Sequence, residues 1–105
     1  MKQVHKYQVI VSDRATQMLI SHAAFLARVS PDAAEQLTSS FEDTANSLQE
    51  MPQRCPWFNG EYIPRYKYRY ILFEKRYAII FQIQEDCVYA DYVLDCRQDN
   101  RWIFK

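Results

Sequence analysis

The chain has 105 residues and a mass of 12.6 kDa, which is room for one domain, and 49% of its residues are hydrophobic. Thirteen basic and thirteen acidic residues give a formal charge of zero, which argues against nucleic-acid binding through the charge of the whole protein. The single glycine excludes a glycine-rich phosphate loop, and no apolar run approaches the roughly 18 residues that a membrane span needs.

We expect one domain over residues 1–105, located in the cytoplasm. Residues 1–6 lack the apolar region and the small-residue cleavage site of a secretory signal. The three cysteines, Cys55, Cys87 and Cys96, form no C-x-x-C pair and have no histidine at ligand spacing. The sequence therefore predicts reduced thiols, with no disulfide framework, no metal site and no cofactor.

The first half of the chain predicts a strand followed by two helices. Residues 6–12 are rich in β-formers, and Ser12 and Asp13 provide a cap and a first-turn acid for a helix. Ser30 and Pro31 end this helix and begin the next, so we expect a tight helical hairpin. Apolar residues recur at spacings of three and four in both helices: Ala15, Met18, Leu19, His22, Phe25, Leu26 and Val29, then Ala34, Leu37, Phe41, Ala45 and Leu48. We expect the ring of His22 to be hydrogen-bonded within the fold, in preference to a ligand or catalytic role.

The second half predicts a loop and three strands. Residues 51–64 contain three of the four prolines and the only glycine, and their apolar side chains indicate an ordered loop packed along the domain. The alternative is an aromatic platform for a base or a partner. From residue 65 the side chains alternate in type with a period of two, which predicts a strand. Residues 77–84 and 87–96 are predicted to follow it as further strands of an antiparallel meander. We expect Trp102, Ile103 and Phe104 of the tail to fold back onto the core.

This order, β-α-α-β-β-β, predicts an α+β domain whose helical hairpin packs on one face of an antiparallel sheet. Tyr66, Tyr68 and Tyr70 are expected on one side of the second strand. Lys67 and Arg69 are expected on the other side, on the open face, because burying an unpaired charge costs several kcal/mol.

Residues 54–76 carry six basic and two acidic side chains, a net charge of +4. This basic segment fits either a focused anion site or a solvated edge strand protected by Lys and Arg.

Two classes of hydrolase chemistry are disfavoured by the spacing of the residues. His5 and His22 both lie in the N-terminal part of the chain, and His5 precedes the first strand. This placement disfavours a Ser–His or Cys–His pair for nucleophilic catalysis. Asp91 and Asp95 would lie about 13 Å apart along one strand, beyond the spacing of paired catalytic carboxylates. What remains is a set of Arg and Lys interleaved with Tyr, a composition typical of sites that hold phosphates and stack bases.

Several segments resemble the RelE/ParE family of toxins, also called plasmid stabilisation proteins. The resemblance lies in the order of elements, in the loop Met51-Pro-x-Arg-x-Pro, in RYKYRYILFEKRYAIIFQI and in the closing YVLDCRQDNRW, and it spans nearly the whole chain. It implies a RelE/ParE-like fold and the toxin half of a type II toxin–antitoxin pair, with a cognate antitoxin as partner and an oligomeric complex with it.

The family contains two mechanisms. RelE-like members cleave messenger RNA on the ribosome as endoribonucleases, and ParE-like members poison DNA gyrase. By resemblance, Lys67 and Arg69 match the basic positions of the second strand and Arg97 matches the basic residue after the last strand, so we expect these three to carry activity. Arg65, Arg76 and Tyr77 are expected to be auxiliary.

Two departures from the cleaving pattern slightly favour a non-cleaving inhibitor of gyrase. Tyr77-Ala78 stands where cleaving members commonly carry Tyr-Arg, and Asp95 stands near the position of a family histidine. A missing transition-state cation can cost about 100- to 1,000-fold in rate. Two alternatives remain at the level of sequence: a ribosome-dependent mRNA endoribonuclease, in which case the chain is an enzyme, and a degenerate antitoxin-binding domain without toxicity.

Overall fold

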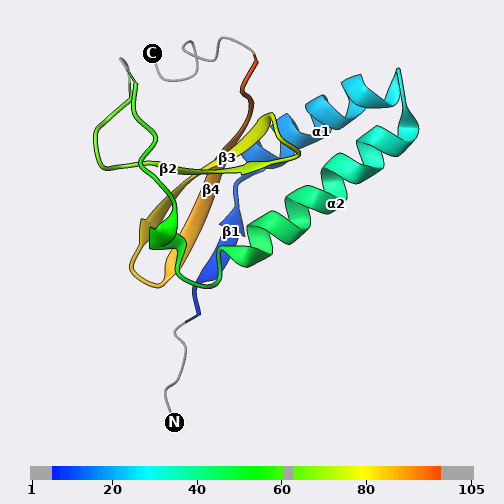
Figure 1. Ribbon diagram of the computed structural model, residues 1–105. Helices are drawn as coiled ribbons and strands as arrows, with labels where there is room; N and C mark the ends of the chain where they lie inside the picture. Colours follow the sequence, from blue (N-terminus) through cyan, green and yellow to red (C-terminus); the bar gives the residue numbers. More distant parts are fainter. Residues whose placement is uncertain (1–5, 61–62, 98–105) are drawn as a thin grey trace.

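The computed structural model describes residues 6–60 and 63–97 and contains the predicted order of elements (Figure 1). The elements are β1 (Gln8–Val11), α1 (Asp13–Ala27), α2 (Pro31–Ser47), the 3₁₀ helix η1 (Pro52–Arg54), β2 (Arg69–Phe73), β3 (Tyr77–Gln84) and β4 (Cys87–Asp95). The α+β fold class is therefore confirmed. The predicted packing of Trp102, Ile103 and Phe104 lies outside the described residues.

The four strands form one sheet in the order β1-β4-β3-β2. β2, β3 and β4 are the predicted antiparallel meander. β1 pairs with β4 in parallel, Val9 opposite Val88, so the sheet is mixed and not wholly antiparallel. The register shifts between Ile80 and Phe81, which leaves Asp91 as an extra residue on β4, a β-bulge.

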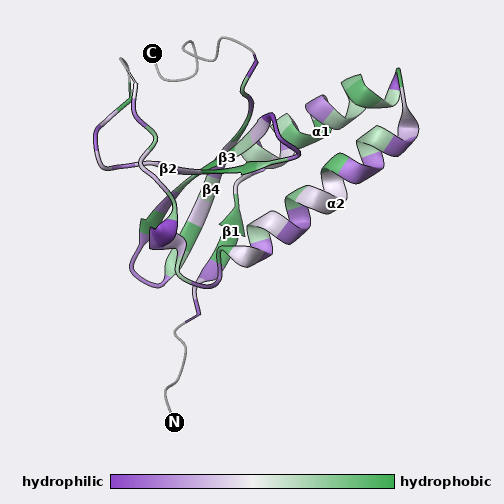
Figure 2. Ribbon diagram, in the orientation of Figure 1, coloured by the Kyte–Doolittle hydropathy of each residue, from purple (hydrophilic) through white to green (hydrophobic). Residues whose placement is uncertain are grey.

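Both helices begin where the sequence predicts. The Ser12 hydroxyl accepts a hydrogen bond from the backbone N–H of Ala15 at 3.0 Å, and that of Ser30 accepts from Ala33 at 3.2 Å. α2 alternates hydrophobic and hydrophilic residues along its turns (Figure 2). Within residues 6–60 and 63–97, no helix combines the length and hydrophobicity that crossing a bilayer requires.

The helical hairpin covers one face of the sheet. The main core joins the helices to β2, β3 and β4 through Ala15, Leu37, Phe41, Ala45, Phe73, Tyr77, Ile79, Ala90 and Val93. The far end of the hairpin projects past the sheet (Figure 1). For that reason Phe25 and Val29, both expected in the buried stripe of α1, are 63% and 85% exposed, which corrects that part of the prediction.

The predicted facing of β2 is wrong. Arg69 is paired with Phe81, which is fully buried in a cluster with Leu48 and Ile71 on the helix side of the sheet. Two of the three predicted tyrosines occupy the opposite face: Tyr68 and Tyr70 pack with Ala78, Ile80, Tyr92 and Leu94, whereas Tyr66 is exposed in the preceding turn. Alternation alone separates the two faces of a strand but does not say which of them the helices cover.

The predicted start of β2 at residue 65 is also wrong, because the strand begins at Arg69. Tyr66 has a φ of 59°, in the left-handed region that extended chain does not occupy. Lys67 therefore lies in the turn before the strand and shares no strand face with Arg69. The described part of the loop, residues 51–60 and 63–64, packs on the domain as predicted, since Phe58 and Ile63 lie against the cluster that contains Tyr68 and Tyr70.

Candidate functional site

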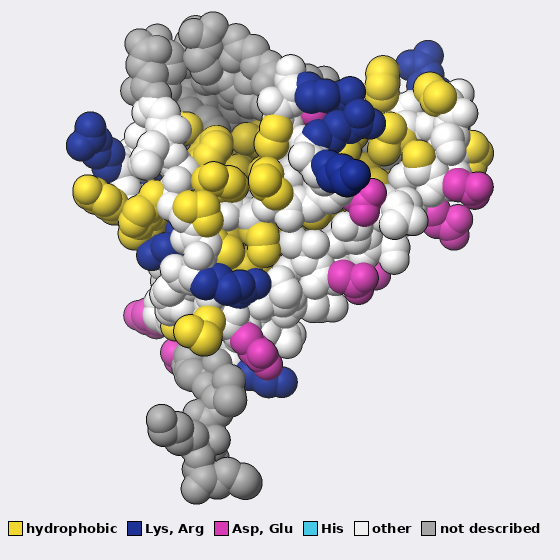
Figure 3. All heavy atoms as spheres, in the orientation of Figure 1, with side chains coloured by type: hydrophobic (Ala, Val, Ile, Leu, Met, Phe, Trp, Pro, Cys, Tyr) yellow, Lys and Arg dark blue, Asp and Glu magenta, His cyan; other side chains and the backbone are white. Residues whose placement is uncertain are grey.

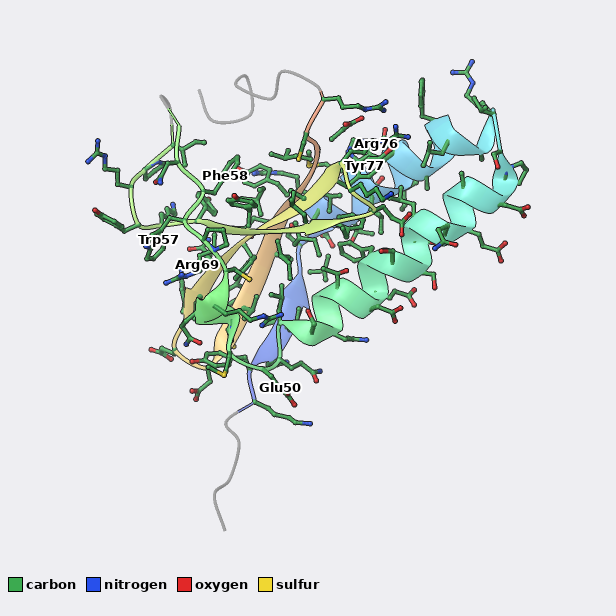
Figure 4. All side chains as sticks on the ribbon, viewed as in Figure 1. Glu50, Trp57, Phe58, Arg69, Arg76 and Tyr77 are labelled. Carbon is green, nitrogen blue, oxygen red and sulfur yellow. The ribbon has the colours of Figure 1, made fainter. Side chains whose placement is uncertain are left out.

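Arg69 holds the proline-rich loop against the edge of the sheet (Figure 4). Its Nη1 donates hydrogen bonds to the carbonyl oxygens of Cys55 at 2.7 Å and of Gln53 at 3.1 Å. The guanidinium carbon lies 3.8 Å from the ring centroid of Trp57, a cation–π distance. The charge of Arg69 is thus satisfied by neutral backbone groups, which explains how an arginine can face the helix side of the sheet.

Two further predicted cations lie beside this loop. Lys67 is exposed, with its Nζ 5.3 Å from the ring centroid of Tyr68. Arg65 lines a pocket of about 340 Å³ together with Asn59, Gly60 and Tyr66. Both cations precede β2 and so belong to the end of the sheet at which this strand begins.

Arg76, Tyr77 and Arg97 meet at the other end of β2. Arg76 lies in the β2–β3 turn, with its guanidinium carbon 5.8 Å from the ring centroid of Tyr77 (Figure 4). Tyr77 pairs with Asp95 across the sheet, and the backbone N–H of Cys96 donates to the Arg76 carbonyl at 2.7 Å. These contacts bring the backbone just before Arg97 to that of Arg76, and Tyr77 separates the two arginine side chains into neighbouring pockets.

The structure therefore divides the six predicted site residues into two groups. Phe73, at the far end of β2, is paired with Tyr77, and the strand rise places it about 13 Å from Arg69. Arg76, Tyr77 and Arg97 are brought together there. Arg65, Lys67 and Arg69 remain at the opposite end of the strand.

A cleft of about 610 Å³ opens between α1 and the end of β4. We call it the α1–β4 cleft, and it is lined by Ser21, His22, Ala24, Phe25, Arg28, Tyr77, Asp95 and Arg97. Figure 3 shows Lys and Arg side chains gathered beside hydrophobic ones in the region between the end of the sheet and the helical hairpin. The sequence signal for this cleft was the spacing of His22, Phe25 and Arg28, which places them along one side of a helix.

An ion pair forms one wall of the α1–β4 cleft. Asp95 is only 4% exposed, and its carboxylate accepts hydrogen bonds from the backbone N–H of Arg97 at 3.0 Å and from Nη2 of Arg97 at 3.2 Å. Burial raises the pKa of Asp95, but the hydrogen bonds and charge of Arg97, with His22, outweigh it and lower the pKa below its ordinary value. The same hydrogen bond to Asp95 raises the pKa of Arg97.

His22 is bound within the fold, as the sequence predicts. Its Nε2 lies 2.9 Å from the carbonyl oxygen of Val93. A carbonyl oxygen only accepts, so Nε2 carries the proton and donates it in this hydrogen bond. The ring is also packed 5.3 Å from that of Tyr77, centroid to centroid. These contacts fix the imidazole at the wall of the α1–β4 cleft.

Arginine side chains give this cleft donors suited to an anion. Arginine binds carboxylate or phosphate through paired N–H donors, and Arg28 and Arg97 line the same cavity. Asp95, the carboxylate of the cleft, is already paired with Arg97. Among residues 6–60 and 63–97, no three His, Cys, Asp or Glu side chains are grouped so that they could hold a metal ion.

Comparisons with known proteins agree with this fold. Residues 9–100 match the family described as the ParE toxin of the type II toxin–antitoxin system, parDE. A solved structure from the chromosomal ParDE toxin–antitoxin system of P. aeruginosa has a TM-score of 0.70 and 13% sequence identity, covering 87% of this chain and 97% of that chain. Because the sequence identity is only 13%, this similarity shows a shared fold and nothing about function. No curated protein matches the sequence.

Proposed function

The chain belongs to the ParE toxin family of type II toxin–antitoxin systems, and we propose that it arrests growth by inhibiting DNA gyrase without cleaving RNA. Membership of such a system implies a cognate antitoxin as partner. ParE toxins are directed at gyrase, so the family favours this target over the ribosome. We further propose that residues 1–105 act as one domain and that its toxicity depends on Arg76, Tyr77 and Arg97.

The observation that best supports a non-cleaving toxin is the separation of the predicted catalytic cations. Cleavage by a 2′-hydroxyl needs a base and cations that converge on one phosphate, each within hydrogen-bond distance of the reacting atoms. Arg69 and Arg97 stand at opposite ends of β2, and Nη1 of Arg69 donates to two backbone carbonyls. With this arrangement, Lys67 and Arg69 do not converge with Arg97 on one phosphate.

A RelE-like endoribonuclease is the second candidate, and one observation favours it. His22, Tyr77 and Arg97 line the same cleft, and these residue types can supply a base and a transition-state cation. However, Nε2 of His22 donates to the carbonyl of Val93, which leaves only Nδ1 for proton transfer. A gyrase inhibitor requires none of these side chains to act as a base.

Induction of the gene in growing cells tests the proposal, with DNA breaks and RNA ends mapped in the same culture. A gyrase inhibitor gives growth arrest with DNA breaks and no RNA cuts positioned on codons. Codon-positioned RNA cuts without DNA damage would establish the endoribonuclease. Normal growth with neither signal, while the chain is folded and present, would contradict toxicity and favour a degenerate domain that binds antitoxin without being toxic.

A further inference from the structure

A second surface that combines cations with aromatic rings lies at the start of β2, away from the α1–β4 cleft. We call it the loop patch, and it consists of Trp57, Asn59, Arg65, Tyr66 and Lys67. Figure 3 shows Lys and Arg side chains beside hydrophobic ones at the left of the molecule, where Figure 4 labels Trp57. Our proposal for toxicity uses none of these residues, so the loop patch has no role in it.

Tyr66 presents its ring to solvent. The residue is 71% exposed, and its φ of 59° lies in the left-handed region, which bulky residues rarely adopt. Its ring centroid lies 5.5 Å from that of Trp57, and the two planes are nearly perpendicular at 78°. Trp57 is in turn stacked on the guanidinium of Arg69, which donates hydrogen bonds to the loop backbone. The exposed ring therefore has a packed support beneath it.

Two cations flank this ring. Arg65 and Lys67 precede and follow Tyr66 in the chain, and both are exposed. In the part of the chain that the structure describes, no carboxylate forms an ion pair with either of them. A pocket of about 340 Å³ beside the ring is lined by Asn59, Gly60, Arg65 and Tyr66. The side-chain amide of Asn59 offers this pocket both a hydrogen-bond donor and an acceptor.

An exposed ring, two cations and an amide match an unpaired stretch of nucleic acid. Bases stack on aromatic side chains whatever their sequence, cations hold the phosphates, and an amide can hydrogen-bond the edge of a base. A base within a duplex has both faces covered by its neighbours, so only an unpaired base can stack on Tyr66. Because the formal charge of the chain is zero, phosphate contacts alone provide little affinity for a duplex. An acidic peptide would pair with the cations but needs no exposed ring.

We propose that the loop patch binds an unpaired strand of nucleic acid, with one base stacked on Tyr66 and the adjacent phosphates on Arg65 and Lys67. Asn59 hydrogen-bonds the edge of a base that enters the pocket. This binding goes beyond the proposed function and does not depend on gyrase as the target. It is separate from growth arrest, which we assign to residues at the other end of β2.

Fluorescence anisotropy of labelled oligonucleotides tests the proposal with the full chain. The probes are a deoxythymidine strand and a uridine strand of about twelve nucleotides, and a duplex of the first with its complement. The wild-type chain is compared with Tyr66→Ala, Tyr66→Phe and Lys67→Gln. Lys75→Gln is the matched control, because Lys75 is exposed in the turn at the other end of β2. Circular dichroism and thermal melting check that each variant is folded.

We expect single strands to bind more tightly than the duplex. Tyr66→Ala should raise the Kd for single strands by roughly 5- to 100-fold because it removes the stacking surface, whereas Tyr66→Phe keeps the ring and should stay within about twofold. Lys67→Gln should reduce the slope of log Kd against log salt by about 0.7, the value for one phosphate contact on a single strand. Lys75→Gln should change neither quantity. Tighter binding of the uridine strand identifies RNA as the ligand, and tighter binding of the deoxythymidine strand identifies DNA.

Four results would overturn the proposal. They are no binding of any strand by the wild-type chain at low salt, an unchanged Kd for folded Tyr66→Ala, equal affinity for single strand and duplex, and displacement of the strand by a glutamate oligopeptide of equal charge. The last result would make the loop patch a site for an acidic peptide.

Cross-linking locates the site even if Tyr66→Ala does not fold. A strand that contains 5-iodouracil should cross-link under ultraviolet light to the ring on which it stacks, and a cross-linked peptide without Tyr66 would contradict the site. A growth assay separates this proposal from that for toxicity. We expect Tyr66→Ala to lose strand binding while growth arrest persists. Loss of both would support the loop patch and overturn the assignment of toxicity to the other end of β2, and growth arrest by a wild-type chain that binds no strand would overturn the loop patch alone.

Discussion

Replacement of Arg69 should destabilise the protein, although its position in a basic segment suggests a surface cation of little structural consequence. Arg69→Ala removes two hydrogen bonds to the carbonyls of Gln53 and Cys55 and the stacking on Trp57. Hydrogen bonds to a charged group contribute about 1.5–3 kcal/mol each, and a cation–π contact about 0.5–1 kcal/mol when exposed. The lower ends of these ranges add to about 3.5 kcal/mol, and because Arg69 is partly exposed we expect a loss of about 2–3.5 kcal/mol in the free energy of unfolding.

Urea denaturation followed by tyrosine and tryptophan fluorescence gives this free energy, and calorimetry gives the melting temperature. A loss of about 2 kcal/mol should lower the Tm of a domain of this size by roughly 8 °C or more. Lys67→Ala is the control and should change the free energy of unfolding by less than about 0.5 kcal/mol. If Arg69→Ala also stays within about 0.5 kcal/mol of the wild type, Arg69 does not hold the loop and its assignment as a structural residue is wrong.

Three further predictions concern the core and the cleft. Leu37→Ala should cost about 2–5 kcal/mol of stability in urea denaturation, because Leu37 is 1% exposed; a cost under 1 kcal/mol would mean the hairpin is not packed as described. The lowered pKa of Asp95 stabilises the fold fully above the ordinary carboxyl value of about pH 3.9 and progressively less as the pH falls toward the folded-state pKa. Acid titration of stability should therefore be less steep for Asp95→Asn, and identical curves would contradict the ion pair. Arg76→Ala should reduce growth arrest at unchanged stability whereas Lys67→Ala should not, and the reverse result would place activity at the loop.

Local chemistry predicted the helices well. Ser12 and Ser30 cap them as expected, and Pro31 takes the first position of α2, because caps and backbone restrictions act within one turn of chain. Alternation and short turns likewise predicted the three C-terminal strands and their antiparallel pairing, but not the start of β2 or the face that its side chains take. The parallel pairing of β1 with β4 could not be predicted in this way, because it joins Val9 to Val88 across most of the chain.

The candidate site was predicted less well, for a physical reason that Arg69 illustrates. We expected this charge on the open face because no partner was visible in the sequence, yet its partners are backbone carbonyls 14 and 16 residues away. Every residue carries such acceptors, so sequence does not mark the ones that a fold brings near. The α1–β4 cleft depends in the same way on tertiary packing, which sets His22 and Arg28 beside Arg97.

The most direct test of gyrase inhibition uses the purified chain with purified DNA gyrase, relaxed plasmid and ATP. We expect the chain to inhibit supercoiling and to leave cleaved DNA, pre-incubation with the antitoxin to abolish both effects, and messenger RNA on translating ribosomes to stay intact. Full supercoiling at saturating amounts of folded chain, accompanied by cleavage of ribosome-bound RNA, would contradict it.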